Sequence, residues 1–470
     1  MLARAFGRDE LINIGLDNPA NVSDDRIIQD NRANTFTQEV AKVVAVIPLF
    51  RLFLLSSILL LTACQSTVYM MPTPELLRTG ERDPFAANPG KALSPDVQVA
   101  YVTNRLPAFN SGRWPYVTLF DQKLRLGLAT VRVGGETYTT DELYTSSTAA
   151  ERESAVPLTL VATSEQATLA AGQGSPLTTE GRAFFDQINA SLESSRDPDI
   201  TVYLHGANNS FYRSTAQAAQ YAHFTGRNST VLLFSWPSAE SLLRYAVDVN
   251  NARRTFPLFA ELLELLAEHT NARYIDVLAY SAGAQVLSPA LASLRARHAS
   301  EDEHSLRERF RLGEIYYAAP DVDFKTFLRD LETYDGMVQH VTLALNPKDS
   351  VLAFAARHHG VSRAGRPEPG ELTEEETRLV KKAFRDMAFD LLWIEPETIP
   401  GLARGAHDFW YNHPWVSSDV LIQLLYQARP SERGLTPIED IEGRRVWTFG
   451  PDYPQRANEA IEQMTAQSSE

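Results

Sequence analysis

Apolar residues form two alternating patterns along this chain. Short runs that are apolar almost throughout predict buried strands, and they fall at residues 200–210, 229–238, 274–280, 313–323, 338–350 and 389–397. Between these runs, apolar residues recur every three or four positions, which predicts helices at residues 179–194, 213–224, 252–269 and 282–297. Fully apolar strands alternating with amphipathic helices indicate an α/β fold with a mostly parallel central sheet and helices on both faces.

The region before residue 170 has a different pattern. VQVAYVTNR (97–105), LRLGLATVRV (124–133) and PLTLVATS (157–164) are rich in β-branched residues, which predicts strands. We therefore expect antiparallel strands at the N-terminal edge of the sheet.

Chemically useful side chains gather where the predicted strands end. Because parallel α/β sheets carry their chemistry at the carboxyl ends of their strands, this gathering predicts a functional site there. The residues concerned are His205, Trp236, Ser281, Asp321, Asp323 and Asp349.

The stretch DVLAYSAGAQVL (276–287) predicts a strand, a tight turn at Ser281 and a helix, which is the setting of a serine nucleophile. Ser281 could instead be a helix N-cap, because serine is favoured there. Ala279 stands where the common G-x-S-x-G pattern has its first glycine. A small residue is what packing beneath the turn requires, and alanine satisfies it.

A serine hydroxyl needs a base, and the base needs an orienting acid. In the α/β-hydrolase fold the order along the chain is serine, acid, histidine. Asp349 follows a predicted strand, and His407 lies in a loop after the last one, so both suit that order. Asp321 and Asp323 remain alternatives for the acid, and His413 remains an alternative for the base.

An acyl-transfer site also needs N–H donors for the oxyanion. We expect one donor at Ala282, at the start of the helix after the serine, where the helix dipole favours negative charge. We expect the second at Ala207 or Asn208, after the strand that ends in HG. His205 is predicted to support this loop rather than to act as a base.

Residues before the domain resemble a bacterial lipoprotein signal. An apolar run from Leu52 to Leu61 is too short to span a bilayer comfortably and is followed by Cys64, the only cysteine. Residues 1–43 are polar and unlike a signal, so we expect either that translation starts later or that they form a cytoplasmic extension. Gln65 favours sorting to the outer membrane, because aspartate at that position would favour inner-membrane retention. The predicted organisation is an over-extended or disordered N-terminus (1–43), a signal segment (44–63), a flexible tether (64–95), a hydrolase domain (96–430) and a C-terminal extension (431–470).

Composition narrows the function further. The 470 residues carry a formal net charge of −15, which disfavours nucleic acid as a partner. One cysteine allows neither an intramolecular disulfide nor a cysteine-based metal cluster. The predicted chemistry requires no metal and no organic cofactor.

Several motifs together resemble a bacterial family of uncharacterised esterase/lipase-like α/β hydrolases. They are YVTNR, YLHGANNSF, LLFSWPSA, AYSAGA, YYAAPDVD and NPKDSVL, spread over residues 97–430 in the family's order. Alanine two residues before the serine is usual in that family. Tyr280, Ala282 and Gln285 depart from its usual His, Met and Asn.

The resemblance implies a serine hydrolase, most plausibly an esterase acting on a small-molecule or lipid ester and anchored in the envelope through Cys64, facing the periplasm. The alternatives are a catalytically silent binding or scaffold lipoprotein and a thioesterase or amidase. Residues 363–388 could form a cap over the site or an ordinary connecting helix. The sequence does not specify an oligomeric state.

Overall fold

The computed structural model of the protein describes residues 67–78, 82–86, 94–109, 115–170, 172, 177–439 and 445–467. The predicted signal segment and Cys64 lie outside the described residues. Among the residues that are described, no helix combines the length and apolar character needed to cross a membrane.

The described chain is built on one sheet of 12 strands in the order β1-β4-β3-β2-β6-β5-β7-β8-β9-β10-β12-β11. From β2 to β12 along this order neighbouring strands are parallel, whereas β1, β4, β3 and β2 pair antiparallel at one edge, and β11 pairs antiparallel at the other. The predicted fold class is confirmed. The strands are β1 (Val68–Tyr69), β2 (Asp96–Pro107), β3 (Tyr116–Val133), β4 (Pro157–Ala170), β5 (Ile200–Leu204), β6 (Thr230–Ser235), β7 (Ile275–Tyr280), β8 (Leu312–Ala318), β9 (Val338–Leu345), β10 (Phe389–Trp393), β11 (Thr436–Glu439) and β12 (Arg445–Thr448).

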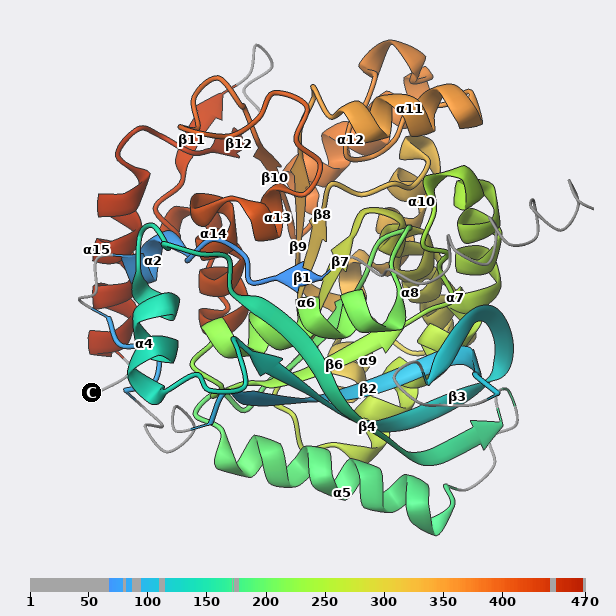
Figure 1. The fold of residues 1–470 in the computed structure, drawn as a ribbon. Coiled ribbons are helices and arrows are strands. Elements are labelled where there is room, and N and C mark those ends of the chain that lie inside the picture. Colours follow the sequence, from blue (N-terminus) through green and yellow to red (C-terminus); the bar gives the residue numbers. More distant parts are fainter. Residues whose placement is uncertain are drawn as a thin grey trace, which may run out of the picture. The chain divides into compact units, whose positions relative to one another are not determined.

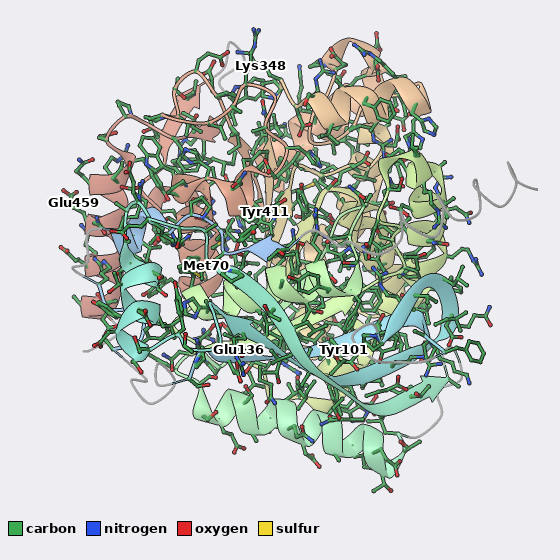
Figure 2. All side chains as sticks on the ribbon, viewed as in Figure 1. Met70, Tyr101, Glu136, Lys348, Tyr411 and Glu459 are labelled. Atoms are coloured by element: carbon green, nitrogen blue, oxygen red, sulfur yellow. The ribbon has the colours of Figure 1, made fainter. Side chains whose placement is uncertain are left out.

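Helices cover both faces of the sheet, because alternate residues of the buried strands point to opposite sides. In β7, Val277 and Ala279 belong to one hydrophobic core, while Leu278 and Tyr280 belong to the other. The first core holds α5 (Thr179–Ser194), α7 (Tyr245–His269), α8 (Ala284–Arg297), α9 (Glu303–Phe310), α10 (Phe324–Tyr334) and α12 (Glu374–Asp386) (Figure 1). The second holds α2 (Glu75–Arg78), α4 (Thr140–Thr148), α6 (Phe211–Phe224), α13 (Phe409–Asn412), α14 (Pro414–Tyr426) and α15 (Tyr453–Gln467). Side chains fill the space between these layers (Figure 2).

The structure corrects two predicted boundaries. The C-terminal extension is not an added surface segment: β12 pairs with β10 at Leu392 and Trp447, and Tyr453 of α15 is fully buried. The described part of the predicted tether is bound to the domain, because β1 pairs with β4 and the Met71 N–H donates to Gln220 Oε1 at 2.8 Å. Both segments extend the domain beyond residues 96–430.

Two helices begin differently from their predictions. α7 starts at Tyr245, well before residue 252, and contains Pro257. The helix predicted from residue 282 starts instead with a 3₁₀ turn, Ser281–Gly283, and continues as α8. Both differences matter because Tyr245 and Ser281 line the same pocket.

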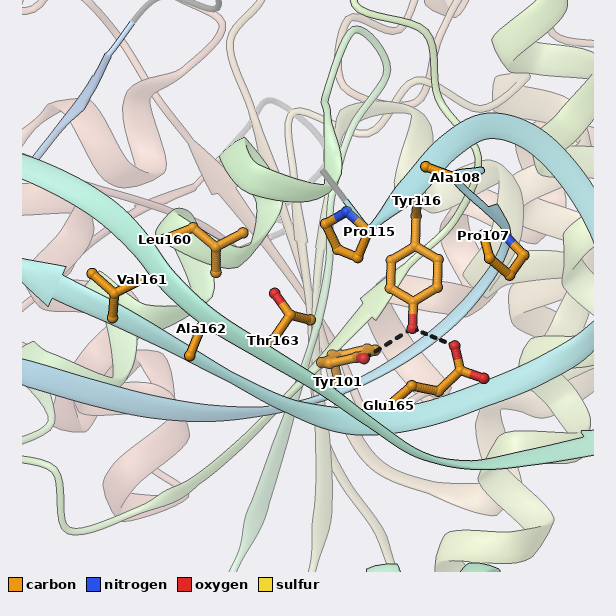
Figure 3. A pocket seen from close by; sticks show the side chains of 10 residues that line it. All are labelled: Tyr101, Pro107, Ala108, Pro115, Tyr116, Leu160, Val161, Ala162, Thr163 and Glu165. Atoms are coloured by element: carbon orange, nitrogen blue, oxygen red, sulfur yellow. Dashed lines mark hydrogen bonds between the residues drawn. The ribbon is translucent and has the colours of Figure 1, made fainter. Parts of the chain in front are cut away.

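The antiparallel edge encloses a cavity of about 490 Å³ between β2, β3 and β4 (Figure 3). The Tyr116 hydroxyl lies 2.9 Å from the Tyr101 hydroxyl and donates to Glu165 at 2.9 Å. Arg125 also binds Glu165, so this carboxylate is already paired. A Cβ at Gly127 would lie 2.5 Å from the Tyr101 hydroxyl, so glycine is needed for this packing. We interpret the cluster as part of the framework.

Candidate active site

Ser281 lies at the sharp turn between β7 and α8. Its backbone φ is +51°, in the left-handed region that residues other than glycine rarely occupy. Gly283 allows the turn to approach β5, because a Cβ there would lie 2.7 Å from the Leu204 carbonyl oxygen. Ala279 is fully buried beneath the turn, as its small size allows. The local sequence thus holds the serine at the carboxyl end of a central strand.

Asp349 and His407 meet Ser281 in one hydrogen-bonded row. Asp349 follows β9 and caps α11 (Ser350–His359), with its Oδ1 accepting the Val351 and Leu352 N–H groups at 2.9 Å. Its Oδ2 lies 2.7 Å from His407 Nδ1, and His407 Nε2 lies 2.8 Å from Ser281 Oγ. The cap fixes the carboxylate, and the carboxylate fixes the imidazole. The structure therefore brings the three predicted residues together.

The electrostatic setting of His407 favours its protonated form. Burial would lower the pKa of His407, but the neighbouring Asp349 carboxylate raises it, with smaller contributions from Asp321 and Asp408, and the net pKa lies above its ordinary value of 6.5. A histidine with this setting can take a proton from a hydroxyl and hold it as imidazolium.

The alternative acids do not contact His407. Asp323 caps α10, with its carboxylate accepting the Thr326 N–H at 2.7 Å. Asp321 accepts from Arg363 Nε at 2.6 Å and from the Tyr245 hydroxyl at 2.5 Å. Asp321 lines the pocket, but its carboxylate is turned toward these two partners.

The alternative base has a structural role as well. His413 caps α14 by accepting the Trp415 N–H at 3.3 Å, and its Nε2 lies 2.9 Å from the Pro400 carbonyl oxygen. Both ring nitrogens are thus engaged away from Ser281.

The loop after β5 lies directly against Ser281. A Cβ at Gly206 would be 2.9 Å from the Cβ of Ser281, so the next residue, Ala207, comes beside the serine. Ala207 and Ser281 both line the pocket. No described residue accepts the Ala207 N–H in a hydrogen bond. The Ala282 N–H belongs to the first turn after the serine, where N–H groups lack an intrahelical acceptor.

The prediction of Asn208 as an oxyanion donor is wrong. Its N–H donates to Asp248 Oδ2 at 3.0 Å, and its backbone φ is +55°. The same aspartate accepts from the Ala239 N–H at 2.7 Å and from the Ser238 hydroxyl at 3.1 Å. Asp248 therefore anchors the loop rather than leaving its N–H groups to a ligand.

Arg105 anchors the other side of this loop and was missed as a site residue. Its buried guanidinium donates to the carbonyl oxygens of Asn209 at 2.8 Å and Ser238 at 3.2 Å. Burial lowers the pKa of Arg105 to about 9, while the charge of Asp248 opposes this change. The YVTNR motif was the available signal for Arg105. For Asp248 the sequence offered only an acidic residue in a helix, which does not by itself indicate a functional site.

His205 supports the loop, as predicted. Its ring stacks on Trp236 with centroids 5.1 Å apart, and its Nδ1 lies 2.8 Å from the Gly206 carbonyl oxygen. Burial lowers the pKa of His205 to about 3, so it is neutral at physiological pH. The Trp236 indole N–H donates to the His205 carbonyl oxygen at 2.7 Å, which closes the packing.

These elements surround a cavity of about 510 Å³ that contains Ser281 and His407. Tyr280 forms one wall, with its ring 5.3 Å from that of His407. Gln285 is buried, and Ala282 is fully enclosed. Among the described residues, no three His, Cys, Asp or Glu side chains are grouped so that they could hold a metal ion.

Comparison with known proteins agrees with this architecture. Residues 181–398 match the family described as "Alpha/beta hydrolase of unknown function (DUF900)". The fold is that of an α/β hydrolase. The matched segment contains Ser281 and Asp349 but ends before His407. The position of His407 beside Ser281 therefore comes from the structure and not from the family match.

Two further comparisons add little. No curated protein matches the sequence. Among solved structures, the salicylyl-acyltransferase SsfX3 from a tetracycline biosynthetic pathway is similar at 12% sequence identity, with 80% of each chain covered and a TM-score of 0.20. A likeness of that size carries no conclusion about this protein.

Proposed function

We propose that the protein is a serine hydrolase that cleaves carboxylic esters through an acyl-enzyme. The observation that carries this proposal is the unbroken row of hydrogen bonds from Asp349 through His407 to Ser281 in a pocket. A serine, a base within hydrogen-bond reach and an acid that orients the base are the groups that nucleophilic catalysis requires.

In this mechanism Ser281 Oγ attacks the ester carbonyl carbon while His407 Nε2 takes the hydroxyl proton. The carbonyl oxygen becomes an oxyanion, which the Ala282 and Ala207 N–H groups stabilise. His407 then gives the proton to the leaving alcohol, and the acyl group remains on Ser281. A water molecule loses a proton to His407, attacks the acyl-enzyme and releases the carboxylic acid, and the proton returns to Ser281.

A fluorophosphonate probe tests this proposal on the full chain. The wild type should be labelled at Ser281, Ser281→Ala should not be labelled, and Ser194→Ala should be labelled like the wild type because Ser194 is exposed at the end of α5. Unlabelled wild-type protein would overturn the proposal and favour a silent binding or scaffold module. The relative rates on matched oxygen ester, thioester and amide substrates decide which bond the site prefers.

We also propose that the protein is a lipoprotein held in a bacterial envelope through Cys64, facing the periplasm from the outer membrane. The support is the sequence alone: the apolar run from Leu52 to Leu61 is followed by Thr62, Ala63 and the sole cysteine, Cys64, which resembles the lipobox of bacterial lipoprotein signals. Stable anchoring needs more than one acyl chain, as bacterial lipoproteins carry. Expression with radiolabelled palmitate tests this, since Cys64→Ser should lose both the label and membrane retention. A retained and unlabelled wild-type protein would contradict it.

A further inference from the structure

The two sides of the Ser281 pocket have different chemistry. On the side formed by α7 and α11, Ala207, Tyr245 and Val351 line the cavity. Tyr245, together with Val249 and Ala355 behind it, forms a small hydrophobic cluster to which Ala207 adds its methyl group. The Tyr245 hydroxyl is directed to Asp321, so its ring is the part left for the pocket. The polar lining residues here already have partners: the Asp321 carboxylate binds Tyr245 and Arg363, and the Ser350 hydroxyl donates to the Gly405 carbonyl oxygen. The rest of this side of the pocket is apolar.

The apolar side continues onto the protein surface along α11. Val351 is 40% exposed and Phe354, three residues later on the same face of the helix, is 57% exposed. Leu352 and Ala355, on the adjoining side of α11, are buried. Exposed apolar residues next to a binding pocket commonly mark contact with an apolar ligand. We call Val351 and Phe354 the α11 stripe.

Two further apolar residues are exposed near the beginning of α7. Leu243, in the 3₁₀ turn Leu242–Arg244, is 99% exposed, and Val247 is 42% exposed. The Tyr245 ring between them packs against His358 and His359 of α11, with centroids 5.7 and 5.6 Å apart. The two helices are thus neighbours at the pocket, and each presents apolar side chains to solvent.

The opposite side of the pocket, formed by α6 and α13, is polar. Arg213, Gln217 and Tyr411 line it. Gln217 Oε1 accepts from the Tyr203 hydroxyl at 2.9 Å and from Asn209 Nδ2 at 2.8 Å, and the Gln217 side chain also forms a hydrogen bond with the Tyr411 hydroxyl. This side of the pocket is therefore built from hydrogen-bonding side chains, which favours a polar group of a ligand over a hydrocarbon chain.

We propose that the substrate is an amphiphilic ester, with a long hydrocarbon acyl chain on the α7–α11 side and a polar, hydrogen-bonding alcohol on the α6–α13 side. We call the two parts of the pocket that hold these groups the acyl limb and the alcohol limb. The inference rests on the proposed hydrolase function, because Ser281 is the point at which the two limbs meet. The acyl chain runs past Tyr245 and Val351 and leaves the pocket over Phe354. The alcohol contacts Tyr411.

The acyl limb is tested with p-nitrophenyl acetate, butyrate, octanoate and laurate, each kept below its aggregation concentration. In the wild type, kcat/KM should rise with chain length, because each methylene laid on the α11 stripe is removed from water. In Val351→Ser/Phe354→Ser the ratio of kcat/KM for laurate to that for acetate should fall about tenfold, on the scale of losing burial of about two methylene groups. Ile438→Ser is the matched control, because Ile438 is 43% exposed on β11 at the far edge of the sheet, and it should keep the wild-type ratio.

The alcohol limb is tested with monolauroyl glycerol and methyl laurate, which share one acyl chain. The wild type should prefer the glycerol ester. Tyr411→Phe should reduce that preference about fivefold through KM, since the hydrogen bond to the alcohol is lost together with those that the hydroxyl forms with Tyr280 and Gln217, while the ring keeps its contacts with Tyr280 and Trp410.

The outcomes separate the two proposals. Fluorophosphonate labelling and acetate hydrolysis without chain-length dependence would overturn the amphiphilic substrate and leave the hydrolase in place. An unchanged laurate-to-acetate ratio in an α11 double variant whose thermal unfolding matches that of the wild type would also overturn it, because the stripe would then contribute nothing to binding of the acyl chain. No labelling and no hydrolysis of any ester would overturn the hydrolase itself.

Discussion

Gly206 lies against Ser281 so closely that a Cβ at position 206 would be 2.9 Å from the Cβ of Ser281. The same Cβ would be 3.2 Å from the ring of Tyr280. The loop with the proposed oxyanion donor Ala207 and the turn with the proposed nucleophile Ser281 are therefore in van der Waals contact. Their spacing depends on the absence of a side chain at one residue.

Gly206→Ala should lower kcat about a hundredfold, because the loop must move and carry the Ala207 N–H away from the oxyanion. Thermal unfolding should change little. Gly370→Ala is the control, since a Cβ at Gly370 meets no atom within 4 Å, and it should behave like the wild type in steady-state kinetics. If Gly206→Ala kept the wild-type kcat, the proposal that this loop stabilises the oxyanion would be wrong.

Asp349→Asn should reduce kcat about 10⁴-fold, because an amide cannot hold His407 in the tautomer that accepts the Ser281 proton. Asparagine is a good N-cap, so α11 should keep its stability. Asp323→Asn keeps the α10 cap and should retain activity. If the Asp323 variant lost activity and the Asp349 variant did not, the acid would be misassigned; kcat and circular dichroism on both variants decide.

The acidic limb of kcat/KM should have a midpoint above pH 6.5, because the pKa of His407 is raised and only its neutral form accepts a proton. Activity should therefore fall as the pH drops through that raised pKa. Asp321→Asn removes one of the charges that raise the pKa of His407, so its midpoint should move to lower pH. Asp323→Asn, whose charge is not among those causes, should leave the midpoint in place.

His340 should make stability depend on pH. Its Nδ1 lies 2.9 Å from Glu314 and its Nε2 2.6 Å from Asp390. Burial would lower the pKa of His340, but the hydrogen bonds to Asp390 and Glu314 raise it above 6.5. Since the folded pKa exceeds the unfolded one, this stabilisation is complete below pH 6.5 and is lost as the pH rises through the folded pKa.

His340→Gln should therefore destabilise the protein by about 3 kcal/mol at pH 6, and by less at pH 9, because a buried partner of two carboxylates is removed. Urea unfolding of both proteins across this range measures the difference. His304→Gln is the control, because His304 is on the surface of α9, and its effect should be small at every pH. A His340→Gln effect that grew with pH would contradict the assignment of charge.

The central strands were predictable, because buried parallel strands are apolar runs that are visible in the local sequence. The order of the candidate serine, acid and histidine along the chain was also visible there. Ser281, Asp349 and His407 were predictable as candidates for the same reason, since each follows such a strand. The sequence favoured Asp349 as the acid by its place in the chain order, but it did not exclude Asp321 and Asp323. All three end strands, and only the direction of each carboxylate separates them.

The sheet edges were harder to predict. β12 has four residues and β1 has two, which is too short for a periodic pattern, and their pairings with β10 and β4 join residues far apart in sequence. The loop anchors Arg105 and Asp248 show the same difficulty. Each is buried and charged, and each binds backbone groups that are distant in sequence: Arg105 binds the Asn209 and Ser238 carbonyl oxygens, and Asp248 binds the Asn208 and Ala239 N–H groups.

At Ser281 the proposed catalytic role of the side chain is in conflict with the stability of the fold, because the backbone is in the left-handed region. A serine there costs about 1 kcal/mol or more that a glycine would not. Ser281→Gly would consequently make the chain more resistant to unfolding and would abolish the proposed chemistry. Selection for stability alone would therefore favour glycine at residue 281, and a serine there indicates selection for something other than stability.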